Sequence, residues 1–92
     1  MLKFKAAVAA GDKGAVASMA QFPLLFVEDE LDKPGFIRQF EAIFDKRVRR
    51  RLLSARPVKD GRFYEVNCGP GAIFEFEKID GEYRFIGIGG SE

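Results

Sequence analysis

The chain has 92 residues, with 15 basic and 14 acidic side chains, ten Phe, one Cys and no His. This length suits one domain, here residues 1–92, and is too short for two hydrophobic cores. Without histidine the chain cannot build a Ser–His or Cys–His nucleophile or an imidazole-ligated zinc site, and with one cysteine it cannot form an intrachain disulfide.

The first third of the chain is rich in alanine, which favours helix. Lys3–Ala10 and Lys13–Ala20 are predicted as two short helices, with Gly11 as the stop of the first and Asp12 as the N-cap of the second. From Pro23 the apolar run "PLLFV" has the length of a strand. We therefore expect two helices followed by a first strand.

An acidic run, "EDELD", covers residues 28–32. It lacks the alternating ligand spacing and the glycine of a calcium-binding loop. Pro34 follows closely, and proline is favoured in the first turn of a helix. The run is therefore predicted to be a turn that leads into a helix, with Asp32 or Lys33 at the cap.

Apolar residues recur at spacings of three and four between Gly35 and Leu53, which predicts one long amphipathic helix over that range. Its apolar stripe consists of Phe36, Ile37, Phe40, Ile43, Phe44, Val48 and Leu52.

Basic residues are concentrated at the end of this predicted helix, where "KRVRRR" covers residues 46–51. At about 100° per residue, Arg47 and Arg51 fall within the apolar stripe. An unpaired charge is not left against an apolar core. Either the helix ends or passes beyond the sheet before residue 47, so that both side chains reach water, or both line an open end of the fold and bind an anion. Lys46, Arg49 and Arg50 are expected to be solvated charges near the negative end of the helix dipole.

Two Asp-Gly pairs, in "KDGR" at 59–62 and "IDGE" at 79–82, predict two β-hairpins joined by the longer loop "NCGPGA". With a two-residue loop, the second hairpin pairs Phe76 with Phe85, Glu77 with Arg84, and Ile73 with Ile88. The first hairpin, treated in the same way, pairs Val58 with Phe63 and Arg56 with Glu65.

Helices followed by a meander of strands predict an α+β fold. In this fold the N-terminal helices and one long amphipathic helix pack on a curved antiparallel sheet. The abundance of phenylalanine predicts a core built mainly from aromatic rings.

Three segments resemble nuclear transport factor two-like domains. "AAVAAGDKGAVASMAQFPLLF" resembles their opening, "FIRQFEAIFDKRV" their central helix, and "GAIFEFEKIDGEYRFIGIG" their last two strands. The resemblance covers nearly the whole chain, and its motifs concern fold more than activity. It implies a cone-shaped roll with a cavity at its open end, dimerisation through the sheet, and a place near small bacterial domains of unknown function.

We expect a non-catalytic module that binds a small molecule, including an anionic one, in a cavity between helix and sheet. The candidate ligand-binding residues are Arg47, Arg51, Tyr64, Phe40 and Phe44, and we expect no cofactor and no metal. One alternative is a lyase or isomerase that uses a cavity tyrosine, although Asp45 and Glu41 lie on the polar side of the predicted helix. Another is an adaptor or inhibitor that binds a protein through the sheet face.

The outer face of the sheet is predicted to carry an apolar patch rimmed by charge, a combination typical of interfaces. We therefore expect a homodimer through Phe63, Ile73, Ile86 and Ile88. Cys68 is expected to be a small packed residue, and Gly87–Gly90 is not a phosphate loop because no helix follows it.

The distribution of charge argues against nucleic acid as a partner. Residues 1–32 hold three bases and five acids, residues 33–59 nine and two, and residues 60–92 three and seven. A general nucleic-acid binder is more often basic overall, with basic and aromatic residues interleaved on one surface, whereas the net charge here is +1.

No apolar run in the sequence approaches the roughly 18 residues of a membrane span, so a membrane is not expected as a partner. The opening "MLKFKAAVAAGD" is too short and too charged in its apolar part for a secretory signal peptide. We expect a soluble protein that is cytoplasmic as the sequence is written. An exported mature domain behind a new Met would look the same, so the compartment stays open.

Overall fold

The computed structural model describes residues 2–26, 29–69 and 72–89. These residues form four helices and six strands. The helices are α1 (Leu2–Ala10), α2 (Lys13–Ser18), α3 (Lys33–Ile43) and α4 (Lys46–Ser54). The strands are β1 (Ala20–Phe26), β2 (Asp29–Leu31), β3 (Val58–Asp60), β4 (Phe63–Asn67), β5 (Ile73–Ile79) and β6 (Glu82–Gly89).

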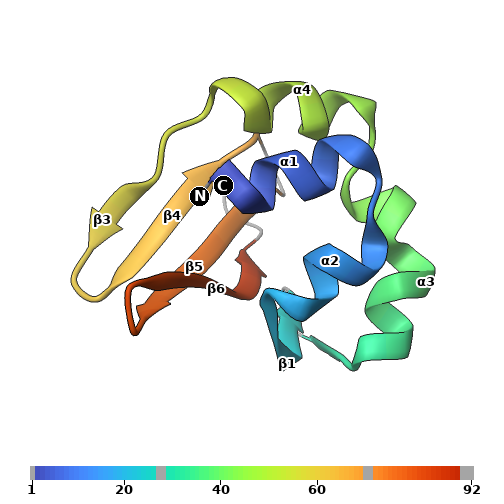
Figure 1. Cartoon of the computed structure of the whole chain (residues 1–92), viewed down its shortest axis with the longest axis horizontal. Helices are drawn as coiled ribbons and strands as arrows, with labels where there is room; N and C mark the ends of the chain where they lie inside the picture. Colours follow the sequence, from blue (N-terminus) through green and yellow to red (C-terminus); the bar gives the residue numbers. More distant parts are fainter. Residues whose placement is uncertain (1, 27–28, 70–71, 90–92) are drawn as a thin grey trace.

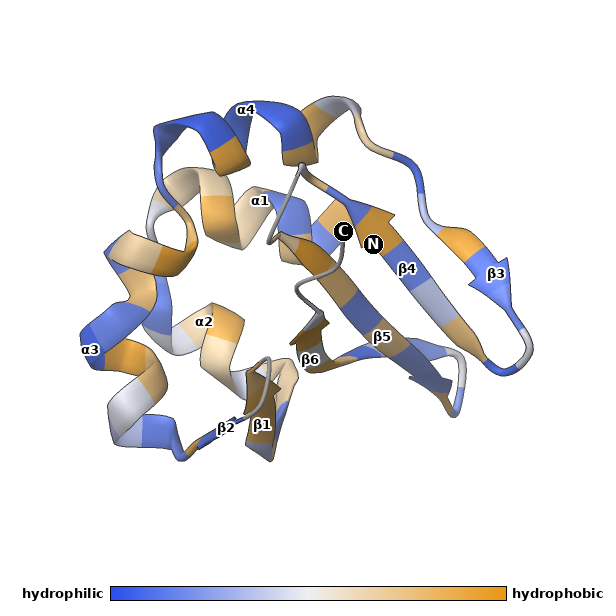
Figure 2. Cartoon of the chain, turned by 180° about the vertical axis from the view of Figure 1, so that it is seen from behind, coloured by the Kyte–Doolittle hydropathy of each residue, from blue (hydrophilic) through white to orange (hydrophobic). Residues whose placement is uncertain are grey.

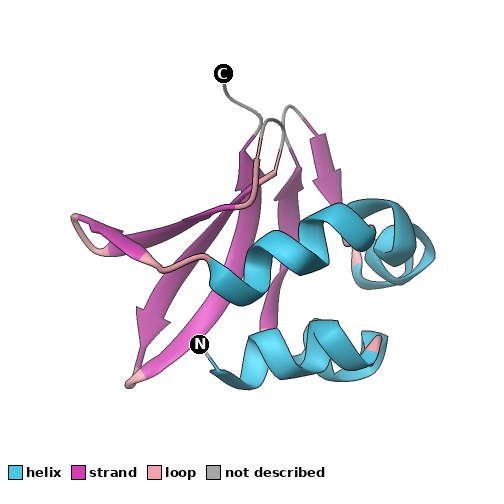
Figure 3. Cartoon of the chain, turned by 90° about the horizontal axis from the view of Figure 1, so that it is seen from above, coloured by secondary structure: helices cyan, strands magenta, loops and turns pink. Residues whose placement is uncertain are grey.

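The predicted α+β fold is confirmed. The strands form one sheet in the order β2-β1-β6-β5-β4-β3, and the helices lie on one side of it (Figures 1 and 3). The sheet is mixed rather than wholly antiparallel, because β1 runs parallel to β6. Within the described residues, no helix is long and apolar enough to cross a membrane.

The single long helix predicted for Gly35–Leu53 is wrong, because the chain leaves the helix at Phe44 and starts a new one at Lys46. Phe44 has φ −108° and ψ 64°, outside the helical region. Asp45 follows with extended backbone, and its Oδ1 accepts the Val48 backbone N–H at 2.9 Å. Aspartate competes with the backbone inside a helix and is favoured at an N-cap, which gives the break its physical reason.

The other two caps follow the sequence-based prediction. Asp12 Oδ1 accepts the Ala15 N–H at 3.1 Å at the start of α2, and Asp32 Oδ1 accepts the Gly35 N–H at 2.8 Å at the start of α3. Each such cap stabilises its helix by about 1 kcal/mol relative to alanine. Gly11, between α1 and α2, has φ +70°, which is costly for residues other than glycine.

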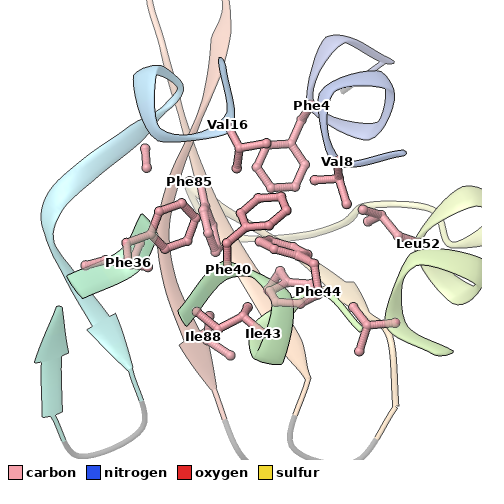
Figure 4. Close-up of a cluster of buried hydrophobic side chains, with 14 of the residues drawn as sticks. Phe4, Val8, Val16, Phe36, Phe40, Ile43, Phe44, Leu52, Phe85 and Ile88 are labelled. Carbon is pink, nitrogen blue, oxygen red and sulfur yellow. The ribbon is translucent and has the colours of Figure 1, made fainter. Parts of the chain in front are cut away.

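The core is a cluster of phenylalanine rings between the helices and the inner face of the sheet (Figure 4). Phe44 stacks on Phe74 of β5 with ring centroids 5.2 Å apart, and Phe40 lies 5.0 Å from Phe44. Phe4 of α1 lies 4.9 Å from Phe76 and 5.3 Å from Phe85, so the first helix also contributes to this cluster. Each fully buried ring stabilises the fold by about 1.5–3 kcal/mol relative to an exposed one.

The β5–β6 hairpin has the predicted turn. Asp80 and Gly81 both have positive φ, 53° and 82°, which is the pattern of a type I′ turn. The predicted pairing of Phe76 with Phe85 and of Glu77 with Arg84 is confirmed.

Further along this hairpin, the predicted pairing of Ile73 with Ile88 is wrong. A bulge at Ile86 shifts the register, so that Phe74 opposes Ile88 and Ile73 opposes Gly89. A one-residue shift sends a side chain to the other face of the sheet. Ile88 therefore points into the core and is 3% exposed.

The predicted register of the β3–β4 hairpin is also wrong, because Val58 opposes Glu65 rather than Phe63. The two loop residues are Gly61 and Arg62, not Asp60 and Gly61. Gly61 has φ +65°, and glycine with positive φ at the first loop position is the pattern of a type II′ turn. The same Asp-Gly dipeptide thus occupies different positions in the two turns.

Candidate functional site: a cavity at the break between α3 and α4

A cavity of about 210 Å³ lies where α3 ends and α4 begins, facing the ends of β1, β5 and β6. Its lining is mainly apolar and consists of Phe26, Gln39, Ala42, Ile43, Asp45, Val48, Ala72, Phe74 and Ile88. Gln39, Ala42 and Asp45 are exposed and belong to the mouth, whereas Phe74 and Ile88 are buried and form the floor.

Two departures from regular secondary structure create this cavity. The break at Phe44 and Asp45 separates the end of α3 from the start of α4. The β6 bulge turns Ile88 inward, where it lies beside Ile43 of α3 (Figure 4). Opposite them, the small side chain of Ala72 leaves space, and its backbone is held by hydrogen bonds to Cys68 and Gly69 at 2.9 and 3.0 Å.

The polar groups of the cavity are few and acidic or neutral. Asp45 Oδ1 is used in capping α4, and within the described residues its Oδ2 has no hydrogen-bond partner in the protein. Gln39 supplies one amide. Since no lysine or arginine among the described residues lines the cavity, its electrostatics suit a neutral molecule with a hydrogen-bond donor better than an anion.

The five predicted ligand-binding side chains are not brought together. Phe40 and Phe44 are fully buried in the ring cluster, and neither lines the cavity. Tyr64 is partly buried on the inner face of β4, with its ring 5.1 Å from that of Tyr83. Arg47 and Arg51 are exposed on α4 and also lie outside the lining.

The helix break explains the positions of Arg47 and Arg51. Because α3 ends before residue 47, α4 starts with a new rotation and buries only Val48 and Leu52. Both arginines then reach the surface, as in the first of the two alternatives drawn from the sequence. The Arg51 guanidinium lies against Gly69, where an added Cβ would come within 2.9 Å of Arg51 Nη1.

Arg49 has a different environment from the other bases of α4. Its Nε donates to the Phe44 carbonyl at 2.8 Å, its Nη2 donates to Glu41 Oε1 at 3.0 Å, and its guanidinium lies 5.7 Å from the centroid of the Phe40 ring. These contacts join α4 to α3 across the break. Arg49 is therefore a structural residue, a role that helical periodicity alone did not reveal.

The structure does not gather the tyrosines and carboxylates of the lyase or isomerase alternative in the cavity. Neither Tyr64 nor Tyr83 lines the cavity. Glu41 is paired with Arg49, and Asp45 caps α4.

Cys68 is buried, and burial raises the pKa of its thiol to about 11, an effect that Lys5 and Arg51 only partly offset. The thiol is therefore protonated at neutral pH and is a poor nucleophile. Within the described residues, no three Cys, Asp or Glu side chains are grouped so that they could hold a metal ion.

The outer sheet face differs in two respects from the predicted interface. Phe63 is 37% exposed, and Ile73 and Ile86 are partly exposed, but Ile88 lines the cavity instead because of the bulge. Leu25 of β1, which the sequence did not indicate, packs beside Gly87 on the outer face. Pairing of two copies through this face stays a prediction.

This face also carries two acidic side chains directly opposite each other, Glu65 on β4 and Glu75 on β5. Partial burial, and then the neighbouring Glu65, raise the pKa of Glu75. A partner that covered this pair would have to neutralise it.

Comparisons of the chain with protein-family models, with curated proteins and with solved structures found no match.

Proposed function

We propose that this domain is a non-catalytic binding module whose cavity takes a small, uncharged and largely apolar molecule. The observation that carries the proposal is the cavity between the α3–α4 break and the sheet, with an apolar floor and, among the described lining residues, Gln39 and Asp45 as polar side chains. Ligand sites are typically concave and apolar, with a few placed polar groups that set orientation. The implied roll of the nuclear transport factor two-like domains, with its cavity at an open end, supports the same proposal.

The size of the cavity sets the size of the ligand. A dry apolar cavity of about 150 Å³ is large enough for benzene. A volume of about 210 Å³ therefore suits one ring with a short substituent. A hydroxyl or amine on that substituent would donate to the free Asp45 oxygen, whereas a carboxylate would be repelled by it.

Benzyl alcohol and benzoate are matched probes for this proposal, since they share a ring and differ in charge. We expect benzyl alcohol to shift the backbone amide resonances of Val48, Phe74 and Ile88 in a saturable titration, and benzoate to leave them unchanged. Ala72→Leu should fill the cavity and abolish the shifts, while Ala6→Leu on the exposed side of α1 should keep them. Equal binding of benzoate, or full binding by folded Ala72→Leu, would contradict the proposal.

A further inference from the structure

The basic residues form a surface of their own on α4 and the neighbouring α1. The two helices lie side by side, and Lys5 Nζ of α1 donates to the Ala55 carbonyl at 2.6 Å at the end of α4 (Figure 1). Residues 46–59 hold seven bases and no acid, and residues 2–11 hold two bases and no acid. All 14 acidic residues lie elsewhere in the chain, together with six bases. A nearly neutral chain thus has one strongly cationic side.

Four residues of α4, Lys46, Arg47, Arg50 and Arg51, form what we call the α4 basic face. All four are exposed, and at about 100° per residue they cover a continuous arc of about 140°. Figure 2 shows that most of the α4 ribbon is hydrophilic. The ion pairs found within residues 2–26, 29–69 and 72–89 involve Lys13, Arg49 and Arg62, and none involves this face.

Most of the α4 basic face is unfavourable for the helix that carries it, and only Arg51, in the last turn, is favoured by the helix dipole. Lys46 and Arg47 stand in the first turn, where the helix dipole is positive. Lys46 and Arg50, like Arg47 and Arg51, are like-charge pairs four residues apart, which destabilise a helix. A departure from local preferences that no ion pair of the described residues offsets is expected at functional sites, and a bound polyanion would remove the repulsion.

We infer that the α4 basic face binds the phosphate backbone of a nucleic acid. Its arginines present planar guanidinium forks that match phosphate. A membrane fits less well, because the apolar side of α4, Val48 and Leu52, is buried and cannot insert into a bilayer. An acidic protein also fits less well, because Leu53 is the only large exposed apolar side chain that α4 offers as an anchor.

The net charge of the chain does not oppose this inference, although it argued against nucleic acid at the level of composition. At physiological ionic strength, charges are screened over about 8 Å. The molecule measures 31 × 27 × 25 Å, so acids on its far side act only weakly at α4. The two acids beside α4, Asp45 and Glu41, are engaged in capping α4 and in pairing with Arg49. The local charge of the α4 basic face therefore sets its affinity for phosphate. Binding should be independent of base sequence, because phosphate contacts carry no base information.

Fluorescence anisotropy with labelled 20-nucleotide single strands and 20-base-pair duplexes of random sequence tests the inference. At low salt the wild-type protein should bind at least one of these probes, and the affinity should fall steeply with added salt. The variant Lys46→Gln/Arg47→Gln/Arg50→Gln should bind at least about 100-fold more weakly near 0.1 M salt, with a log–log salt slope smaller by about 3. It keeps Arg51 and its contact with Gly69.

A matched control removes three exposed bases elsewhere, Lys33→Gln/Arg38→Gln/Lys78→Gln, and should bind within about twofold of wild type. Thermal melts separate binding from folding, since the α4 variant should melt at or above the wild-type temperature once the like-charge pairs are gone. The inference is overturned by an absence of binding at 50 mM salt, by equal loss in the control, or by a lowered melting temperature of the α4 variant. Tighter binding to polyglutamate or to phosphatidylserine vesicles would also overturn it, in favour of an acidic protein or a membrane.

Discussion

The helices α3 and α4 are adjacent in the chain and start in the same way, with an aspartate whose Oδ1 accepts a backbone N–H of the first turn. They differ in what they present. α3 buries two phenylalanines between α2 and the sheet, whereas α4 buries only Val48 and Leu52 and turns its bases to water. One apolar periodicity therefore runs through two helices with separate roles. The change of direction at Asp45 allows the first to build the core and the second to present charge.

The largest expected effect comes from truncating the core side of each helix. Phe40→Ala should lower the free energy of unfolding by about 3–5 kcal/mol, because the ring is fully buried among Phe36 and Phe44. Leu52→Ala should lower the free energy of unfolding by an amount nearer the lower end of about 2–5 kcal/mol, because α4 can move toward the core and partly fill the space that the side chain leaves. Urea melts of both variants measure the difference. A loss below about 1 kcal/mol for Phe40→Ala would contradict the claim that α3 packs its phenylalanines into the core.

A smaller effect should separate the bases of α4 from one another. Arg49→Gln loses the hydrogen bond to the Phe44 carbonyl, the Glu41 ion pair and the contact with Phe40, and should cost about 1–2 kcal/mol. Arg50→Gln, a matched change one residue away, should alter stability by less than about 0.5 kcal/mol, in the stabilising direction. Equal costs in denaturant melts would show that Arg49 does not hold the two helices together.

The smallest expected effect concerns the outer sheet face, where two negative charges, those of Glu65 and Glu75, lie directly opposite each other. The pKa of Glu75 is raised in the folded state, so the folded protein binds its proton more tightly than the unfolded chain does. Stability then falls as the pH rises from the ordinary glutamate pKa through the raised one. Glu75→Gln should therefore be more stable than wild type at pH 7, and the difference should shrink as the pH falls toward the ordinary glutamate pKa. A gain that persists unchanged at pH 4 would point to packing instead of charge.

Sequence reasoning was accurate at several local signals, although the equally local Asp60–Gly61 pair misplaced the β3–β4 turn by one residue. The Asp12 and Asp32 caps, the type I′ turn at Asp80–Gly81 and the α+β order of elements each depend on a few neighbouring residues whose backbone preferences agree. It was wrong at Asp45, although the cap that breaks the helix was visible as an aspartate between the apolar residues 42–44 and the basic run 46–51. There the three-and-four spacing of apolar residues was given more weight than the preference of aspartate for an N-cap.

By itself, the sequence determined the caps at Asp12 and Asp32, the turn at Asp80–Gly81 and the use of phenylalanine in the core, because these follow from local backbone preference and from hydrophobic burial. Only the tertiary structure decided the bulge at Ile86, the inward turn of Ile88 and the cavity that this residue helps to line. Both Phe85 and Ile88 are buried on the same side of β6, which an uninterrupted strand cannot achieve over three residues. The extra residue is selected by packing against α3 and β5, segments that are distant in the chain and carry no signal within β6 itself.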